Sequence, residues 1–267
     1  MAGRRGERGA PRPGGAATRR GRDRVRVEVA VESPDGAAAA VEGGADRVEL
    51  CAQLACGGLT PSAGAITATL EQALVPLVML VRPRAGDFLY SVREFDVMRR
   101  DIDAGLRAGV HGFALGVLLP DGRIDVRRTA LLVEGCGGRP VTFHRAFDQV
   151  PDADAALEEL VALGVARVLS SGQARSAAEG AECLARLVQR AAGRLAVLAG
   201  GGVRAHNIAA LVAATGVREV HFSAGRTVLS AMQRPPAVPP GSAGAPREDE
   251  LPVTDAALVR ACIDALP

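Results

Sequence analysis

The chain has 267 residues and is 48% apolar, which indicates a globular protein with a sizeable core and not a disordered one. All 32 basic residues are Arg, so a catalytic Lys that forms a Schiff base is excluded. The formal net charge is +2, but residues 1–24 carry +6 (eight Arg against two acidic residues), so the rest of the chain carries −4. A mildly acidic body argues against a nucleic-acid-binding surface on the domain.

The N-terminal segment, residues 1–23, is rich in Gly, Arg and Pro, and we expect a disordered tail there. It has no aromatic side chain to stack on a base, which favours a solvated extension over a nucleic-acid contact. Elsewhere no apolar run reaches the roughly 18–20 residues that span a bilayer, and no signal peptide is recognisable. We therefore expect a cytoplasmic protein that does not enter the membrane.

From residue 24 onward, short runs rich in Val and Leu alternate with longer segments of helical periodicity. The predicted strands are 24–31, 46–51, 76–82, 112–118, 140–145, 166–171, 195–200 and 219–223. The predicted helices are 34–43, 61–73, 91–108, 125–134, 152–163, 176–191, 203–215 and 254–266. Eight successive β–α units favour one closed (β/α)₈ TIM barrel over a doubly wound sheet.

The barrel domain is expected to span residues 24–267, with a Pro/Gly-rich loop at 234–250 after the last strand. A loop in this position falls on the catalytic face of a TIM barrel. It is therefore either a lid over that face or an unstructured insertion.

Alternation along the strands predicts which side chains point into the barrel. The interior positions are unusually polar for this fold, whose interior is normally filled by branched apolar residues. They include Arg26, Glu28, Arg47, Glu49, Cys51, Thr142, His144, Glu219, His221 and Ser223. Buried charges are costly unless they are paired or bound to a ligand, so these groups must meet one another or a ligand. We expect Arg26, Arg47 and Glu219 to pair near the bottom of the barrel.

Higher in the barrel, Glu28 and Glu49 are expected within reach of Arg82 and His144 at the ends of neighbouring strands. Two carboxylates beside an imidazole and a guanidinium form a plausible proton-transfer set. The alternative is a buried ion network that only stabilises the fold, because such networks also perturb pKa values. The position at the strand ends favours the functional interpretation.

Two short segments add charged groups where strands end. Arg82 and Arg84 flank a proline that stiffens the exit of the third strand, and guanidinium groups suit carboxylate or phosphate recognition. The segment 144–148 brings Arg145 and Asp148 close behind the histidine that ends the fifth strand. We expect His144 and Asp148 to take part in catalysis with the two glutamates, and the three arginines to bind an anion.

The loops after the seventh and eighth strands are the usual phosphate site of this architecture, where backbone N–H groups act as donors. Here these loops are rich in Gly and Ser, as is the loop after the sixth strand. The predicted ligand-binding residues in this region are Ser171, Gly200, Gly201, Gly202, His221 and Ser223.

Two of the five cysteines lie near the predicted mouth: Cys51 at the end of the second strand and Cys56 in the loop after it. Thiolates are the ligands that soft metals such as copper(I) prefer. The odd number of cysteines and the absence of a CxxC pair argue against a disulfide framework or a structural zinc site.

Seven segments in order resemble the CutC family. They are GGADRVELC (43–51) with GGLTPSAG (57–64), RPRAGDFLYS (82–91), VTFHRAFD (141–148), LSSGQ (169–173), AGGGVRAHNI (199–208) and EVHFSAG (219–225). The resemblance runs from about residue 24 to 226 and resumes in the last helix. It implies a TIM barrel, a cytoplasmic homo-oligomer and a role in copper homeostasis, with copper(I) bound through cysteines.

Within this resemblance, Cys51 matches the family's VELC motif. Family members often carry another cysteine at the end of the first strand, where this chain has Ala30 and Val31, so Cys56 is the candidate second ligand. No organic cofactor is implied.

Three functions stay open at this point. The family resemblance implies copper handling. The charged mouth instead predicts an enzyme that acts on a small phosphorylated or carboxylated metabolite, with His144 or Glu49 transferring the proton and the arginines holding the anion. A sensor would bind the same anionic ligand without turnover.

Overall fold

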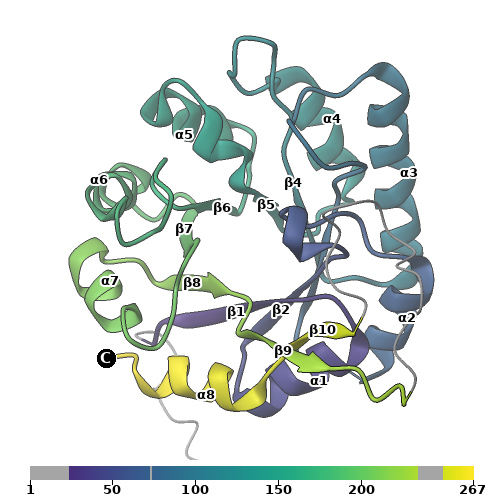
Figure 1. Cartoon of the computed structure of the whole chain (residues 1–267). Coiled ribbons are helices and arrows are strands. Elements are labelled where there is room, and N and C mark those ends of the chain that lie inside the picture. Colours follow the sequence, from purple (N-terminus) through teal and green to yellow (C-terminus); the bar gives the residue numbers. More distant parts are fainter. Residues whose placement is uncertain (1–23, 73, 234–248) are drawn as a thin grey trace, which may run out of the picture.

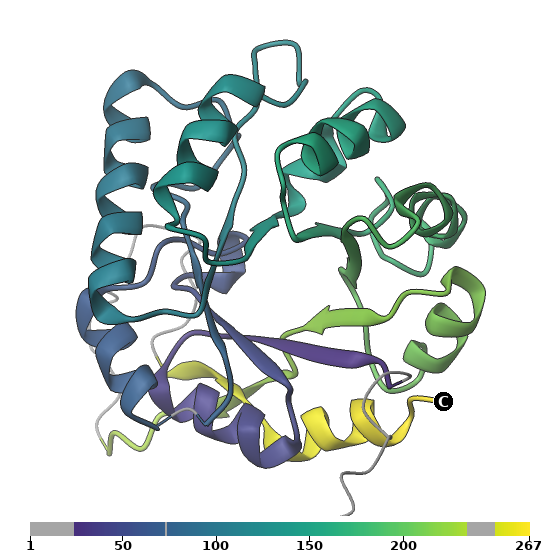
Figure 2. The same ribbon diagram turned by 180° about the vertical axis from the view of Figure 1, so that it is seen from behind.

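The structure, a computed structural model, describes residues 24–72, 74–233 and 249–267. Eight parallel strands pair in sequence order and close into a barrel, with helices packed around its outside (Figure 1, and from behind in Figure 2). This is the predicted (β/α)₈ TIM barrel. The strands are β1 (Arg26–Val31), β2 (Arg47–Leu50), β3 (Leu77–Leu80), β4 (Gly112–Leu115), β5 (Val141–Phe143), β6 (Arg167–Ser170), β7 (Ala196–Gly200) and β8 (Glu219–Phe222).

Each barrel strand is followed in the chain by a helix of the outer layer. These helices are α1 (Pro34–Gly43), α2 (Ala63–Gln72), α3 (Val92–Ala108), α4 (Val126–Gly135), α5 (Ala153–Ala162), α6 (Ala181–Ala191), α7 (Ile208–Thr215) and α8 (Ala256–Asp264). Two 3₁₀ helices follow strand ends, η1 (Leu54–Cys56) after β2 and η2 (Arg145–Gln149) after β5. In the described part of the chain, no helix is long and apolar enough to span a bilayer.

The apolar side chains divide into two groups, as the alternation along the strands predicts. The main core lies between the outer faces of the strands and the helices, and it includes Val27, Val48 and Phe143. Inside the barrel, a small separate cluster joins Cys51, Val78, Leu80 and Ala114 with the half-buried Leu54. Polar groups share the rest of the interior with a few apolar side chains such as Leu169 and Leu198, so the polar pattern read from the sequence is a property of the barrel itself.

Helices α6 and α7 begin about five residues later than predicted. Before α6, the backbones of Gly172 and Gly180 approach so closely that a Cβ atom on Gly180 would lie 2.0 Å from the carbonyl oxygen of Ser171. Before α7, the Asn207 side chain accepts a hydrogen bond from Arg204 N and donates one to Gly202 O. Both loops therefore have a fixed non-helical shape next to the strand ends.

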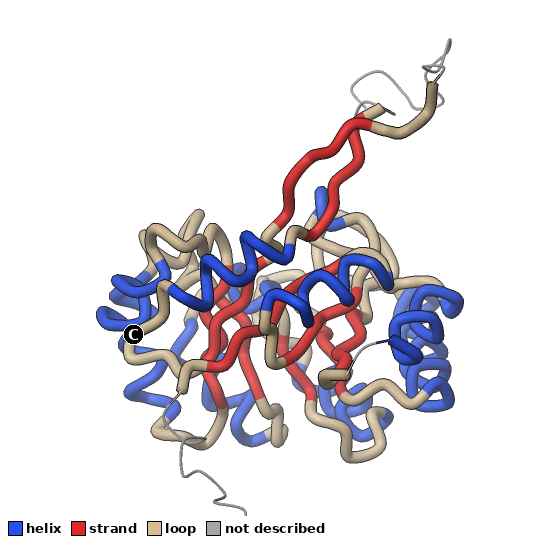
Figure 3. The backbone as a smooth tube through the Cα atoms, turned by 90° about the horizontal axis from the view of Figure 1, so that it is seen from below, coloured by secondary structure: helices blue, strands red, loops and turns tan. Residues whose placement is uncertain are grey.

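After β8 the chain forms an antiparallel ribbon that the periodicity did not predict. It consists of β9 (Gly225–Leu229) and β10 (Glu250–Thr254), and it projects away from the barrel before α8 begins (Figure 3). Pro252 in β10 disfavours a strand in sequence-based reasoning, but an edge position tolerates it. The predicted loop at 234–250 thus ends in a strand at Glu250, while its residues 234–248, like the predicted tail at 1–23, lie outside the described residues.

Candidate functional site

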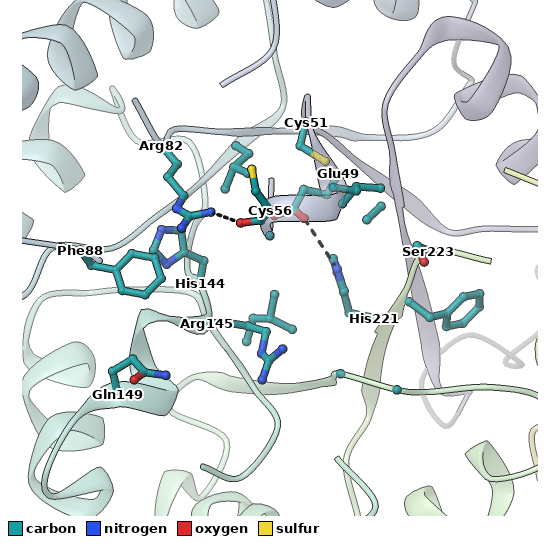
Figure 4. A pocket seen from close by; sticks show the side chains of 18 of the residues that line it. Glu49, Cys51, Cys56, Arg82, Phe88, His144, Arg145, Gln149, His221 and Ser223 are labelled. Carbon is teal, nitrogen blue, oxygen red and sulfur yellow. Dashed lines mark hydrogen bonds and ion pairs between the residues drawn. The ribbon is translucent and has the colours of Figure 1, made fainter. Parts of the chain in front are cut away.

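A cavity of about 420 Å³ opens where the strands end at their carboxyl termini (Figure 4). Figure 4 shows Arg82, Phe88 and His144 together on one side and Glu49 facing His221 on the other. The predicted site residues that line the cavity are Glu49, Cys51, Cys56, Arg82, His144, Arg145, Gly201, Gly202, His221 and Ser223. The structure thus brings together residues from β2, β3, β5, β7 and β8 and the loops that follow them.

His221 connects the two interior carboxylates. Its Nδ1 lies 2.8 Å from Oε1 of Glu28, and its Nε2 lies 3.7 Å from Oε2 of Glu49. Burial disfavours the imidazolium, but the hydrogen bond with Glu28 and the charges of both carboxylates raise the pKa of His221. Burial, reinforced by the Glu28 charge, raises the pKa of Glu49 to about 7. Glu49 therefore exchanges its proton near neutral pH at the cavity wall.

Glu28 lies below the cavity and belongs to a buried ion network. It is bonded to Arg47, whose Nη2 lies 2.7 Å from Oε2 of Glu219, and Arg167 Nε lies 3.1 Å from the same oxygen. Although burial opposes it, the hydrogen bond from His221 and the charge of Arg47 lower the pKa of Glu28 to about 2. Glu28 thus stays ionised and holds His221 in place.

Two predicted pairings are wrong. Arg26 is exposed and does not join the bottom network; Arg167 takes that place beside Glu219. Glu28 turns to His221 because the β1–β8 register places these two residues side by side, whereas Arg82 and His144 lie at the ends of β3 and β5, on the other side of the barrel. For Glu49, too, the partner in the described structure is His221.

His144 is buried and uncharged. It follows β5 and caps η2, and its Nδ1 accepts a hydrogen bond from Ala146 N at 3.2 Å. Burial, together with the positive charge of Arg82, lowers the pKa of His144 to about 3. Its Nε2 is buried and has no hydrogen-bond partner among the described residues.

Arg82 and Arg84 have different surroundings. The Arg82 guanidinium donates to the carbonyl oxygens of Cys56, Gly58 and Gly86 at 2.7–2.9 Å, so it lines the cavity as a fixed positive charge. Arg84 lies outside the cavity, which corrects its predicted place at the site. Its guanidinium is bound by Glu94 in α3 and by the exposed Asp87, so it fixes the loop before α3.

Asp148 positions Arg145. Its buried carboxylate accepts hydrogen bonds from Arg145 Nε (2.8 Å), from both Ser170 Oγ and Ser171 Oγ, and from backbone N–H groups after β6. Arg145 also donates to Ser171 Oγ at 2.8 Å, and its side chain is 44% exposed at the cavity. Asp148 and Ser171 were predicted to meet the ligand directly, but they lie behind Arg145 and orient it.

The glycines after β7 let the backbone come close to the cavity. Gly201 and Gly202 have φ values of +104° and +71°, and a Cβ on Gly201 would lie 3.5 Å from Cζ of Arg145. Gly200 lies one residue below the cavity lining, where a Cβ would lie 2.6 Å from Leu169. The exposed Arg204 also lines the cavity and was missed by the sequence analysis, although it stands two residues after the glycine run.

Cys51 and Cys56 line the same cavity, but the surroundings of Cys51 do not favour a thiolate. The Cys51 thiol donates to Val31 O at 3.5 Å, and burial, with the negative charge of Glu49, raises its pKa. The exposed Cys56 donates to Gln53 O at 3.1 Å. Among the described residues, no group of three or more His, Cys, Asp or Glu could hold a metal ion. Burial of the Cys51 thiol works against a tight copper(I) site, because the metal binds the thiolate form.

The fold and the cavity define a TIM barrel with a charged site at the carboxyl ends of its strands. The chain belongs to the CutC family, whose model matches residues 25–226. It is 44% identical over 247 residues to a CutC family protein of Sinorhizobium medicae, covering 91% of this chain and 98% of that one. Against its counterpart from Chromobacterium violaceum the identity is 47% over 241 residues, covering 90% and 97%.

Among solved structures, a putative copper homeostasis protein CutC from Streptococcus agalactiae is similar, with a TM-score of 0.71 and 31% identity. The match covers 74% of this chain and 98% of that one. Thiamine phosphate pyrophosphorylase from Pyrococcus furiosus, at a TM-score of 0.54 and 14% identity, shares the fold alone. Family membership supports a general link to copper homeostasis through the family's name.

Proposed function

We propose that this protein is an enzyme that moves a proton on a small anionic metabolite, with Glu49 as the group that accepts and returns the proton. The observation that carries this proposal is the pair formed by Glu49 and His221, buried at the wall of a cavity wide enough for a metabolite. A pKa of about 7 lets one carboxyl group act as both base and acid near neutral pH.

The supporting residues make this pair suited to catalysis. Glu28 and its bond to Arg47 keep His221 oriented from below, so the imidazole does not rotate away from Glu49. When Glu49 is ionised, His221 stabilises the negative charge from 3.7 Å away. Of the two predicted proton acceptors, His144 is disfavoured because burial and the charge of Arg82 lower its pKa to about 3, which makes it a weak base at neutral pH.

The anionic part of the substrate is expected to bind at the β5, β7 and β8 ends. Arg145, Arg204 and the backbone of Gly201–Gly202 line that side of the cavity, and Ser223 follows β8 beside them. Guanidinium groups and the N–H groups of glycine-rich loops are typical ligands of phosphate and carboxylate. Arg145 is held in place by Asp148, so it is pre-oriented for such a group.

Calorimetric titration with phosphate monoesters and dicarboxylates tests this anion site. The expected result is that Arg145→Ala weakens binding about tenfold, the loss typical of one charge-assisted hydrogen bond. Arg84→Ala is the matched control, because that guanidinium is bound to Glu94 outside the cavity. Equal losses in both variants, or none in Arg145→Ala, would place the anion elsewhere.

Turnover is tested by Glu49→Gln, which keeps the size of the side chain and removes its proton exchange. For any ligand found by titration, ¹H NMR in D₂O reports whether a C–H group exchanges with solvent. Exchange in the wild type that is lost in Glu49→Gln supports the enzyme. Binding without exchange would instead support a sensor of the same ligand.

Copper(I) binding is the second candidate function, and the shared position of Cys51 and Cys56 at one cavity favours it. Copper would then be cargo held by two thiolates. An anaerobic competition titration against a chromophoric chelator tests it in the wild type, Cys51→Ala and Cys56→Ala. Tight one-to-one binding lost in both variants would support copper handling, whereas weak binding unchanged by either substitution would leave the enzyme proposal alone.

A further inference from the structure

His144 is held in one orientation before any ligand binds. Its Nδ1 accepts the N–H of Ala146 at 3.2 Å, so in the neutral ring the proton is on Nε2. Phe88 packs on the ring with centroids 5.0 Å apart. At Gly116 the chain comes so close that a Cβ would lie 2.6 Å from Cε1 and 2.7 Å from Nδ1 of His144. These contacts leave the ring little freedom to turn.

In the described part of the chain, the Nε2–H group of His144 lacks an acceptor. The residue is only 5% exposed and lines the cavity, and no described residue accepts a hydrogen bond from Nε2. A buried donor left unpaired is costly, and proteins tolerate it mainly where a ligand completes the bond. The missing partner is therefore an oxygen or nitrogen acceptor on the substrate.

The charges around His144 indicate what kind of acceptor this is. Arg82, whose guanidinium is fixed by the carbonyl oxygens of Cys56, Gly58 and Gly86, contributes a positive charge that also lowers the pKa of His144. A fixed positive charge beside a neutral N–H donor stabilises an oxygen that becomes negative during a reaction. Glu49, the proposed proton acceptor, lies on the opposite side of the same cavity (Figure 4).

We propose that His144 donates its Nε2–H to the carbonyl oxygen of the substrate, which is a small carbonyl compound with a second, anionic group. This inference rests on the proposed function and names its substrate class. The anionic group lies near Arg145 and Gly201, and the carbon next to the carbonyl faces Glu49. Neither a metal nor a Lys is needed to polarise the carbonyl, and the chain contains no Lys.

The step balances without a co-reactant. Glu49 takes a proton from the carbon next to the carbonyl, the electron pair of that C–H bond forms a C=C bond, and the carbonyl π pair moves onto oxygen. The resulting enolate accepts a hydrogen bond from His144, which keeps its proton throughout. When Glu49 returns a proton to the same face of that carbon, the carbonyl re-forms with the hydrogen exchanged for one from solvent and the configuration retained.

The protonation state is tested first, by ¹⁵N NMR of the full-length chain labelled at histidine. Loss of the signals in His144→Gln, or in His144→Asn if the Gln variant does not fold, assigns them to His144. We expect a protonated Nε2 and an unprotonated Nδ1 throughout the range from pH 5 to pH 9. Titration of His144 within this range, or a proton on Nδ1, overturns the inference.

The role is tested with two probes, 2-phosphoglycolate for binding and glyceraldehyde 3-phosphate for exchange of its C2 hydrogen in D₂O. His144→Ala is expected to weaken the binding of 2-phosphoglycolate at least tenfold. It is also expected to lower kcat for exchange about 10²–10³-fold, the loss typical of removing one hydrogen-bond donor to an oxyanion. His144→Gln, which retains an N–H donor, is expected to recover part of kcat with KM little changed.

If His144→Ala exchanges the C2 hydrogen at the wild-type rate, this role is overturned. It is also overturned if the wild type neither binds 2-phosphoglycolate nor exchanges the hydrogen. Glu49→Gln separates the two proposals. If exchange survives in Glu49→Gln but is lost in His144→Ala, the assignment of the proton acceptor fails while the donor role of His144 stands.

Discussion

Glu49 is a residue whose burial is expected to cost stability. Its pKa is raised from the ordinary range to about 7, so the folded protein binds this proton more tightly than the unfolded chain does. The stability that this proton contributes is fully present below the pKa that Glu49 has in the unfolded chain, and it is lost as pH rises toward 7. Glu49→Gln should therefore raise the free energy of unfolding at pH 8 by on the order of 2 kcal/mol, while removing activity.

Urea denaturation of wild type and Glu49→Gln at pH 5 and pH 8 checks this expectation. The difference between the two proteins should be larger at pH 8. A Gln variant less stable than the wild type at pH 8 would mean that the Glu49–His221 pair stabilises the fold. That result would favour the alternative that these charges form a purely structural network.

Glu28 gives the opposite prediction. Its pKa is lowered to about 2 by the hydrogen bond from His221 and the charge of Arg47, against the effect of burial. A depressed carboxyl pKa contributes stability above the unfolded pKa, and this contribution is lost as pH falls from about 4.5 toward 2. Glu28→Gln should cost about 3–5 kcal/mol at neutral pH, because it leaves a buried ion network incomplete. Glu28→Gln should also reduce the loss in free energy of unfolding that the wild type shows as pH falls below about 4.5, as measured by urea denaturation.

Individual residues of the site were predictable to the extent that strand alternation determines which side chains point inward. Glu28, Glu49 and His221 were placed in the interior by that rule, and the structure has them there. Their pairing was not predictable, because a closed barrel places β8 beside β1 but the sequence does not reveal the register that sets Glu28 next to His221. Nor could the sequence show that His144 is neutral, since this follows from burial and from Arg82 on another strand.

At the level of elements, the periodicity predicted the barrel strands and helices, because each is a regular segment with one apolar face. It failed where loop backbone contacts delay a helix, as before α6. There Gly180 has an ordinary φ, but a Cβ would lie 2.0 Å from Ser171 O and 2.8 Å from Gly172 Cα. Only the folded loop reveals this contact.

Gly180→Ala is therefore expected to destabilise the protein by roughly 1–3 kcal/mol or more, since backbone atoms must move to make room. Gly64→Ala in α2 is the matched control: nothing lies within 4 Å of its Cβ position, so the substitution should stabilise the helix by about 0.5–1 kcal/mol. Thermal unfolding of both variants measures the difference. Equal midpoints would mean that the loop after β6 is free to rearrange.

At the scale of the whole molecule, the β9–β10 ribbon is the part that the barrel does not explain. It projects from the barrel (Figure 3). Two apolar side chains of this region lie in solvent: Leu229 is 73% exposed and Met232, just beyond it, is 71% exposed. An isolated two-stranded ribbon is marginally stable in water. The ribbon would gain stability if a second copy of the chain covered these side chains, in line with the homo-oligomer that the family resemblance implies.

We therefore expect a homo-oligomer that depends on this ribbon. Leu229→Glu, alone or with Met232→Glu, should shift the mass measured by light scattering after size exclusion to that of one chain, because burying a carboxylate in an apolar contact is costly. Leu74→Glu is the control, since Leu74 is 91% exposed and lies after α2, away from the ribbon. A wild type that is already monomeric, or a ribbon variant with unchanged mass, would show that the ribbon serves another purpose.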